Sequence, residues 1–210
     1  MTEFTSEEIS SLEKRYKANL INSVTGYKSA NLIGSISENS ISNLAVFNSI
    51  LHIGSSPALI GFVLRPLTVE RHTYANIKSS QFYTVNQIHS GIIEQAHQTS
   101  AKYATEISEF GKTGLNEEYV KHISAPFVKE SKVQIACKYV NEYEIKENGC
   151  LLMIGQIEML RVQEKLIQAD GWVDHMAANT ASILGLDGYA EGKLINRFAY
   201  ARPDEPIKVL

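Results

Sequence analysis

Residues 6–22 show the periodicity of an amphipathic helix. Apolar side chains that recur every three or four positions share one face of a helix. Here they stand at Ile9, Leu12, Tyr16, Leu20 and Ile21. Thr5 followed by Glu8 has the pattern of a capping box, and Gly26 is a common stop signal. The pattern predicts one helix over residues 6–22, which packs on the rest of the chain or on a second subunit.

Beyond this helix the pattern changes to short runs that are typical of strands. The runs cover residues 29–37, 42–51, 58–64 and 81–88, with Asn, Gly, Ser and Pro at the breaks. The run 58–64 is almost continuously apolar, which indicates a strand buried on both faces. These segments therefore predict a sheet with a fully buried member.

Helical spacing returns in two short segments. Tyr74 and Ile77 indicate a short helix between residues 66 and 80, and a second helix is expected over residues 90–101. The span 102–130 is expected to be an irregular excursion that contains one helical turn at 116–121.

Two long strands are predicted over residues 132–146 and 150–163. The segment Lys146–Gly149 joins them and contains Asn-Gly. Asn-Gly is a strong hairpin signal, because a tight primed turn needs positive φ at both central residues. We therefore expect an antiparallel hairpin here.

The last part of the chain holds Trp172, a weakly helical stretch at 174–183 and an apolar, aromatic stretch at 193–200. Several strands with interspersed short helices, and no regular alternation of the two, predict a mainly β fold with peripheral helices. The expected architecture is an antiparallel barrel. We assign residues 1–26 to the N-terminal helix and residues 27–210 to one barrel domain.

Composition and charge exclude several classes of protein. Hydrophobic residues make up 44% and charged residues 20%, and the net charge is −3, so a general nucleic-acid-binding protein is not expected. The first residues lack both a basic start and an apolar signal core. Asn39–Leu64 carries no Asp, Glu, Lys or Arg, but its many polar side chains would be costly in lipid. No membrane span is predicted, and we expect a cytoplasmic protein.

The cysteines and histidines indicate no metal site. Cys137 and Cys150 fit a reducing compartment, as two thiols rather than a disulfide, although pairing stays an alternative. Phosphate-binding glycine loops and the common hydrolase and metalloprotease motifs are missing. The histidines show no close pairing, and a lone histidine is more often structural than a ligand. They stand at positions 52, 72, 89, 97, 122 and 175.

Several short segments, in a fixed order, resemble a known family. They are Asn43–Ser49 (NLAVFNS), Ser56–Arg65 (SPALIGFVLR), Arg71–Ile77 (RHTYANI), Phe82–Asn86 (FYTVN), His97–Ala101 (HQTSA), Ala125-Pro126 with Val128, and Gly185–Tyr189 (GLDGY). Their order and spacing are similar to those of the flavin reductase-like family, in which the corresponding patterns include N-L-A-P-F-S, K-D-T-x-x-N-I and N-x-T-S-A. The resemblance covers residues 28–203 and implies an antiparallel FMN-binding split β-barrel.

The chain departs from the family pattern at a few positions. Val46 replaces a proline, Asn48 replaces a serine, and Arg71-His72 replaces Lys-Asp. Arg71 keeps the positive charge that a phosphate needs, and the change to His72 removes a negative charge beside it. An anionic ligand therefore stays compatible with this segment.

The resemblance implies a set of FMN-binding residues. A phosphate is recognised by cations and small hydroxyls, and arginine offers it a two-pronged donor. The backbone of Asn43 to Ala45 and the Asn86 amide could match the isoalloxazine edge. The apolar side chains of Phe47, Phe62 and Leu64 could contact the ring. The expected set is Asn43, Leu44, Ala45, Phe47, Asn48, Ser49, Phe62, Leu64, Arg65, Arg71, His72, Thr73, Asn86, His97 and Thr99. On periodicity alone, the alternating apolar residues of this set would be assigned to a barrel core.

The resemblance also implies an activity. We expect an NAD(P)H-dependent flavin reductase that transfers hydride to flavin N5 and passes electrons to oxygen, an oxygenase or another acceptor. No residue must act as acid or base; His97 or His52 is the candidate if one assists. Members of the family are usually homodimers with flavin near the subunit interface. The alternatives are an FMN-binding electron carrier and a barrel that binds another ligand or partner and has lost flavin.

Overall fold

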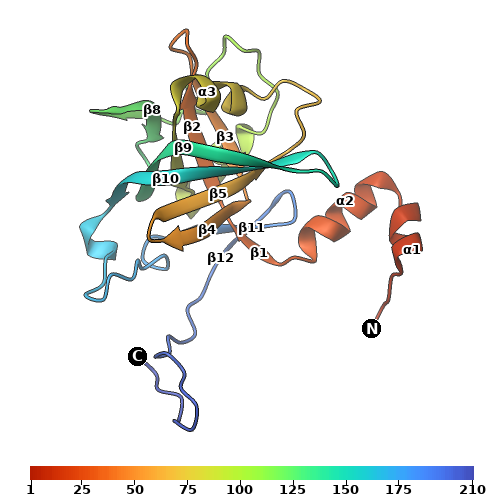
Figure 1. Cartoon of the computed structure of the whole chain (residues 1–210), viewed down its shortest axis with the longest axis vertical. Helices are drawn as coiled ribbons and strands as arrows, with labels where there is room; N and C mark the ends of the chain where they lie inside the picture. The colour runs from red at the N-terminus through yellow and green to blue at the C-terminus, as the bar shows by residue number, and fades with distance from the viewer.

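A seven-stranded antiparallel sheet forms the body of the computed structural model, which describes all 210 residues (Figure 1). The strand order is β3-β2-β6-β9-β10-β5-β4. In chain order the strands are β2 (Asn31–Ile36), β3 (Ser42–Phe47), β4 (Ile50–Ser55), β5 (Ala58–Leu64), β6 (Phe82–Gln87), β9 (Val133–Ile145) and β10 (Cys150–Val162). Only Asn48 and Ser49 separate β3 from β4, although these strands are the two edges of the sheet. The sheet therefore curls until its edges approach each other, as expected of a barrel.

Two apolar clusters lie on opposite faces of the curled sheet. The inner cluster packs between the strands and α3 (His72–Ser80), and its members include Ile33, Phe62, Ile77, Tyr83, Val85 and Met153. The other cluster joins β2 and β3 to α4 (Ile93–Gln98) and α5 (Glu109–Thr113), and includes Leu32, Leu44, Ala96, Phe110 and Ile183. Because successive strand residues point to opposite faces, Leu32 and Ile33 belong to different clusters.

Two smaller sheets complete the fold. β1 (Tyr27–Ser29), β11 (Ala181–Leu184) and β12 (Gly188–Glu191) form a three-stranded sheet in the order β1-β11-β12. β7 (Glu117–Val120) and β8 (Ile123–Val128) form a hairpin. Short 3₁₀ turns cover Ser90–Ile92 before α4 and Glu164–Leu166 after β10. No helix has the length and apolar character that crossing a membrane requires.

The single helix expected over residues 6–22 is two helices. α1 (Ser6–Ser11) begins with the predicted capping box of Thr5 and Glu8, and α2 is Lys14–Ser23. The break arises because the Glu13 carboxylate accepts the N–H groups of Arg15 and Tyr16, and so caps a new helix. Neither helix contains a buried residue, and both lie beside the barrel rather than within it (Figure 1).

Other predicted segments are confirmed or corrected as follows. The strands at 58–64 and 81–88, the two long strands, and the helices within 66–80 and 90–101 are confirmed. Burial of β5 on both faces is wrong, because Leu59 and Val63 on its outer face are only partly buried. The run 29–37 divides into β1 and β2, and the run 42–51 divides between β3 and β4. The helical turn at 116–121 is wrong, because this segment pairs with β8 as a strand.

The remaining corrections concern turns. The weakly helical stretch 174–183 is wrong: it consists of turns followed by β11, which pairs with β1 and β12. The stretch 193–200 makes only an isolated bridge between Phe198 and Val209. In the β9–β10 hairpin only Gly149 has positive φ (71°), and Gly149 N–H donates to Ile145 C=O at 2.8 Å. The loop therefore contains four residues and is not a two-residue primed turn.

Candidate functional site

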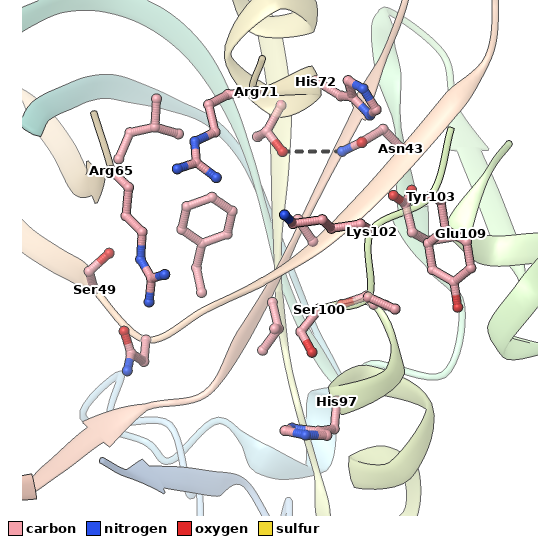
Figure 2. Close-up of a pocket in the computed structure, with 18 of the residues that line it drawn as sticks. Asn43, Ser49, Arg65, Arg71, His72, His97, Ser100, Lys102, Tyr103 and Glu109 are labelled. Atoms are coloured by element: carbon pink, nitrogen blue, oxygen red, sulfur yellow. Dashed lines mark hydrogen bonds between the residues drawn. The ribbon is translucent and has the colours of Figure 1, made fainter. Parts of the chain in front are cut away.

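A cavity of about 610 Å³ opens where β3, the end of β5, the start of α3 and the segment after α4 converge (Figure 2). Twelve of the fifteen residues expected to bind FMN line it: Asn43, Ala45, Phe47, Asn48, Ser49, Leu64, Arg65, Arg71, His72, Thr73, His97 and Thr99. The chain brings them together because the short β3–β4 connection and the β5–α3 connection meet at the same end of the barrel.

One side of the cavity is cationic. Figure 2 shows Arg65 and Arg71 on this side, while Lys102 reaches in from the opposite side. The ion pairs of the chain all involve other residues. Arg71 Nε is buried and has no hydrogen-bond partner within the chain. A buried charged donor without a partner is costly, so this group is suited to an anion that the chain does not supply.

The start of α3 adds further donors to this side. Arg71 occupies the N-cap position and makes no side-chain cap bond, so the first N–H groups of the helix lack a capping acceptor. Thr73 Oγ1 accepts a bond from Asn43 Nδ2 at 3.2 Å, which leaves the hydroxyl proton of Thr73 for another acceptor. A helix N-terminus with free N–H groups and two nearby arginines favours a phosphate or carboxylate.

A buried polar network holds this helix start in place. Asn43 Nδ2 also donates to Ser35 Oγ at 3.3 Å, and Asn76 Nδ2 donates to the same oxygen at 3.1 Å. The network links β2, β3 and α3 beneath the cavity. The Asn43 side chain therefore holds Thr73 in place.

Ser49 has a similar structural use. Its Oγ donates to Val63 C=O at 3.0 Å and accepts Val63 N–H at 3.2 Å. The hydroxyl thus joins the β3–β4 connection to β5 and has no proton left for a phosphate. Ser49 lines the cavity, but its hydroxyl oxygen has only one lone pair left to accept a further hydrogen bond.

The wall beside the cations is apolar. Ala45, Val46, Phe47 and Leu64 form it. The Phe47 ring packs edge-on against Phe62, with ring centres 5.3 Å apart. This wall can contact a planar ligand while the cationic side binds its charged group.

Four residues predicted to act at the site lie outside the cavity. Phe62 is fully buried behind Phe47, and Leu44 is fully buried in the cluster with α4 and α5. Asn86 is also fully buried, where its Oδ1 accepts Val128 N–H at 3.0 Å. His52 is exposed on β4 and bonds Ser55 at 3.2 Å.

His97 occupies the far end of the cavity, next to the tip of the small sheet. Its Nδ1 lies 3.2 Å from the hydroxyl of Tyr189 on β12, and the two rings are nearly perpendicular. Burial raises the pKa of Tyr189 above its usual value. Asn48 Nδ2 donates to Gly185 C=O at 3.3 Å. These contacts close the cavity with a segment that lies 92 positions from His97 and 137 positions from Asn48 in the chain.

Glu109 is the cavity residue that the sequence pattern missed most clearly. It is 6% exposed and its Oε2 accepts Leu44 N–H at 2.9 Å. Burial raises the pKa of this carboxyl, and its hydrogen bonds oppose the rise in part. No local motif marks Glu109, because its position depends on how α5 packs against β3. The other lining residues outside the expected set are Val46, Val63, Val69, Glu70, Ser100, Ala101, Lys102, Tyr103, Ile183, Leu186 and Tyr189. Six of them fall in segments of the resemblance: Val46, Val63, Ser100, Ala101, Leu186 and Tyr189.

Known proteins resemble this chain in sequence and in fold. The family model described as flavin reductase like domain matches residues 27–180. A crystal structure from Shewanella frigidimarina, assigned as a flavin reductase with a split barrel domain, superposes with a TM-score of 0.92 and 42% identity, over 96% of this chain and 100% of that one. The fold also matches nitrilotriacetate monooxygenase component B from Bacillus cereus, with a TM-score of 0.82 and 18% identity, over 94% and 98% of the two chains.

One curated relative has no assigned function. The Bacillus subtilis protein YwrF is 27% identical over 167 residues, which are 77% of this chain and 80% of that protein. The matched region of the family model contains the curled sheet and most of the cavity lining. The expected split-barrel fold is confirmed, and the chain belongs to the flavin reductase-like family.

Proposed function

We propose that this chain binds FMN in the cavity described above and acts as an NAD(P)H-dependent flavin reductase. The observation that carries the proposal is the cationic side of the cavity. Arg65 and Arg71 have no carboxylate partner, and Arg71 Nε is buried without an acceptor. Together with Thr73 and the uncapped start of α3, these groups suit the terminal phosphate of FMN.

The rest of the cavity suits the ring system of the same ligand. A volume of about 610 Å³ lies within the range of small-molecule sites. The apolar wall of Ala45, Val46 and Phe47 offers contact area to a planar ring. His97 and Tyr189 close the opposite end and could exclude water from it. When bound, FMN supplies hydride acceptance at N5 and onward electron transfer, while the protein provides position and electrostatics.

Flavin titration tests the phosphate site. Riboflavin lacks the phosphate, and each lost charge-assisted bond costs about 1.5–3 kcal/mol. We expect riboflavin to bind roughly ten- to hundredfold more weakly than FMN. Fluorescence titration with FMN, FAD and riboflavin measures this preference. Equal affinity for FMN and riboflavin would contradict a phosphate site.

Reduction of the bound flavin separates the reductase from its main alternative, an FMN-binding electron carrier. We expect the protein with FMN to show the flavin absorption bands, and to lose them when NADH or NADPH is added without oxygen. Steady-state oxidation of the nicotinamide with excess FMN should then turn over. Tight FMN binding without turnover would favour the carrier. Absence of flavin bands after FMN is added would favour a barrel that binds another ligand.

We also propose a homodimer. The outer face of β4, β5, β10 and β9 carries apolar side chains that no element of the chain covers. Cross-strand register places Leu51, Ile53, Val63, Leu152 and Tyr143 on this face. Val63 also lines the cavity, so a partner on this face would border the flavin. Large uncovered apolar faces mark interaction surfaces, and α2 with its exposed Tyr16 and Ile21 could add to the contact.

Light scattering tests the dimer and should give twice the chain mass of 23.4 kDa. A monomer that binds FMN with full affinity would contradict a site at the interface.

A component of an oxygenase system is among the relatives of this fold, and we propose an oxygenase or another acceptor as the electron-transfer partner. Two free thiols, Cys137 and Cys150, support a reducing compartment such as the cytoplasm.

A further inference from the structure

β3 is an edge strand, and its outer edge forms part of the cavity. In an antiparallel strand, the N–H and C=O groups of alternate residues point to the same side. Leu44 N–H bonds Glu109 on α5 and not β2. By the same alternation, the backbone groups of Val46, two residues further along, point outward beside Leu44. Val46 lines the cavity, so its N–H is the next donor along this edge.

Glu109 takes the place of a neighbouring strand at the first of these donors. Its carboxylate accepts Leu44 N–H at 2.9 Å. The position of α5 is secured at a second point, because Ser108 Oγ lies 2.6 Å from Ser42 Oγ on the same strand. Figure 2 shows Glu109 on the wall of the cavity, beside Asn43 and Tyr103. A buried carboxylate without a hydrogen-bond donor is costly. The Glu109 carboxylate is therefore stabilised by its bond from Leu44 N–H.

The isoalloxazine edge alternates acceptors and donors, so it can pair with backbone groups along a strand edge. Leu44 N–H and Val46 N–H lie on the same edge of β3, one pleat repeat apart, but Leu44 is fully buried beside α5 and only Val46 lines the cavity. Glu109 occupies the first and leaves the second for the ligand. We propose that Glu109 is the positioning residue of the flavin site, which fixes the outer edge of β3 and so presents Val46 N–H to the ring. This inference rests on the proposed FMN function.

The test compares ring recognition with phosphate recognition. In Glu109→Ala, we expect FMN and riboflavin to lose affinity by the same factor of about ten, equivalent to about 1.4 kcal/mol. The absorption bands of the bound flavin should also shift, because the polar contact of the ring changes. In Glu109→Gln, the amide oxygen can still accept Leu44 N–H, so both affinities should stay within about threefold of wild type.

Glu117→Ala is the matched control. Glu117 also bonds β3, through Ser42 Oγ at 2.6 Å, but it does not line the cavity. It should leave both affinities and the flavin spectrum unchanged. If Glu109 only supported packing, Glu109→Ala would lower the melting temperature without altering the spectrum of bound flavin, and the positioning role would be refuted.

Two results would overturn the role of Glu109. One is wild-type affinity and an unchanged spectrum in Glu109→Ala. The other is a loss for FMN alone, which would place Glu109 on the phosphate side of the cavity. If Glu109→Ala does not fold, Glu109→Asp provides the same comparison against Glu109→Gln, since its shorter side chain draws the acceptor away from Leu44. A wild-type protein that binds neither flavin would instead refute the proposed function.

Discussion

Replacing Arg71 with alanine should weaken FMN binding without destabilising the apo-protein. The Arg71 guanidinium lines the cavity, forms no ion pair, and holds a buried Nε without a partner. One lost charge-assisted bond to phosphate corresponds to about 1.5–3 kcal/mol, and we therefore expect at least about a tenfold loss of FMN affinity. Because the side chain has no carboxylate to leave unpaired, its removal should change the melting temperature little.

Fluorescence titration of FMN and riboflavin, together with apo melting curves, measures these effects. Riboflavin affinity should stay unchanged in Arg71→Ala, since riboflavin has no phosphate. Arg65→Ala provides the comparison within the site. Lys112→Ala provides the control outside it, because Lys112 is an exposed residue of α5 that does not line the cavity. Normal FMN binding by Arg71→Ala together with a loss in Arg65→Ala would place the phosphate at the other end of the β5–α3 connection and refute the assignment.

Two further predictions concern stability. Gly155→Ala should lower the free energy of unfolding by about 1–3 kcal/mol, because the new Cβ would overlap the hydroxyl of Tyr83, which is 1% exposed and cannot move aside. Gly111→Ala, in α5 with open space around it, should instead be neutral or stabilising by up to about 1 kcal/mol in the same denaturation assay. His175 has its pKa lowered by burial, so the neutral form is favoured in the fold and its stabilising effect is lost as pH falls below 6.5. His175→Gln should therefore show a weaker fall of denaturation midpoint with decreasing pH than wild type, and parallel profiles would exclude this contribution.

Local pattern was sufficient for most of the sheet. β5 and β6 are recognisable from their apolar runs. The hairpin of β9 and β10 is recognisable from Gly149, whose positive φ (71°) suits a residue without Cβ. The order of the short motifs also indicated the family correctly. Such features depend on residues near one another in the chain, and so they can be recognised before the fold is known.

Pairing between distant segments overrode local preference elsewhere. Residues 116–121 have the composition of a helical turn but pair with β8 as β7. Residues 181–184 pair with β1, whose residues lie more than one hundred fifty positions earlier. The backbone hydrogen bonds of a strand are made with whichever strand lies beside it. The spacing of residues within one segment does not reveal that neighbour.

The functional site likewise depends partly on local sequence pattern and partly on tertiary structure. Motif positions determined which residues approach the cavity, because the β3–β4 and β5–α3 connections each keep their residues close. Only the tertiary structure decided what each side chain does there. Ser49 Oγ is used by Val63, and Phe62 lies behind Phe47. Glu109 has no recognisable local signal, yet it bonds Leu44 N–H, because an edge strand has free donors that only packing can bring to a partner.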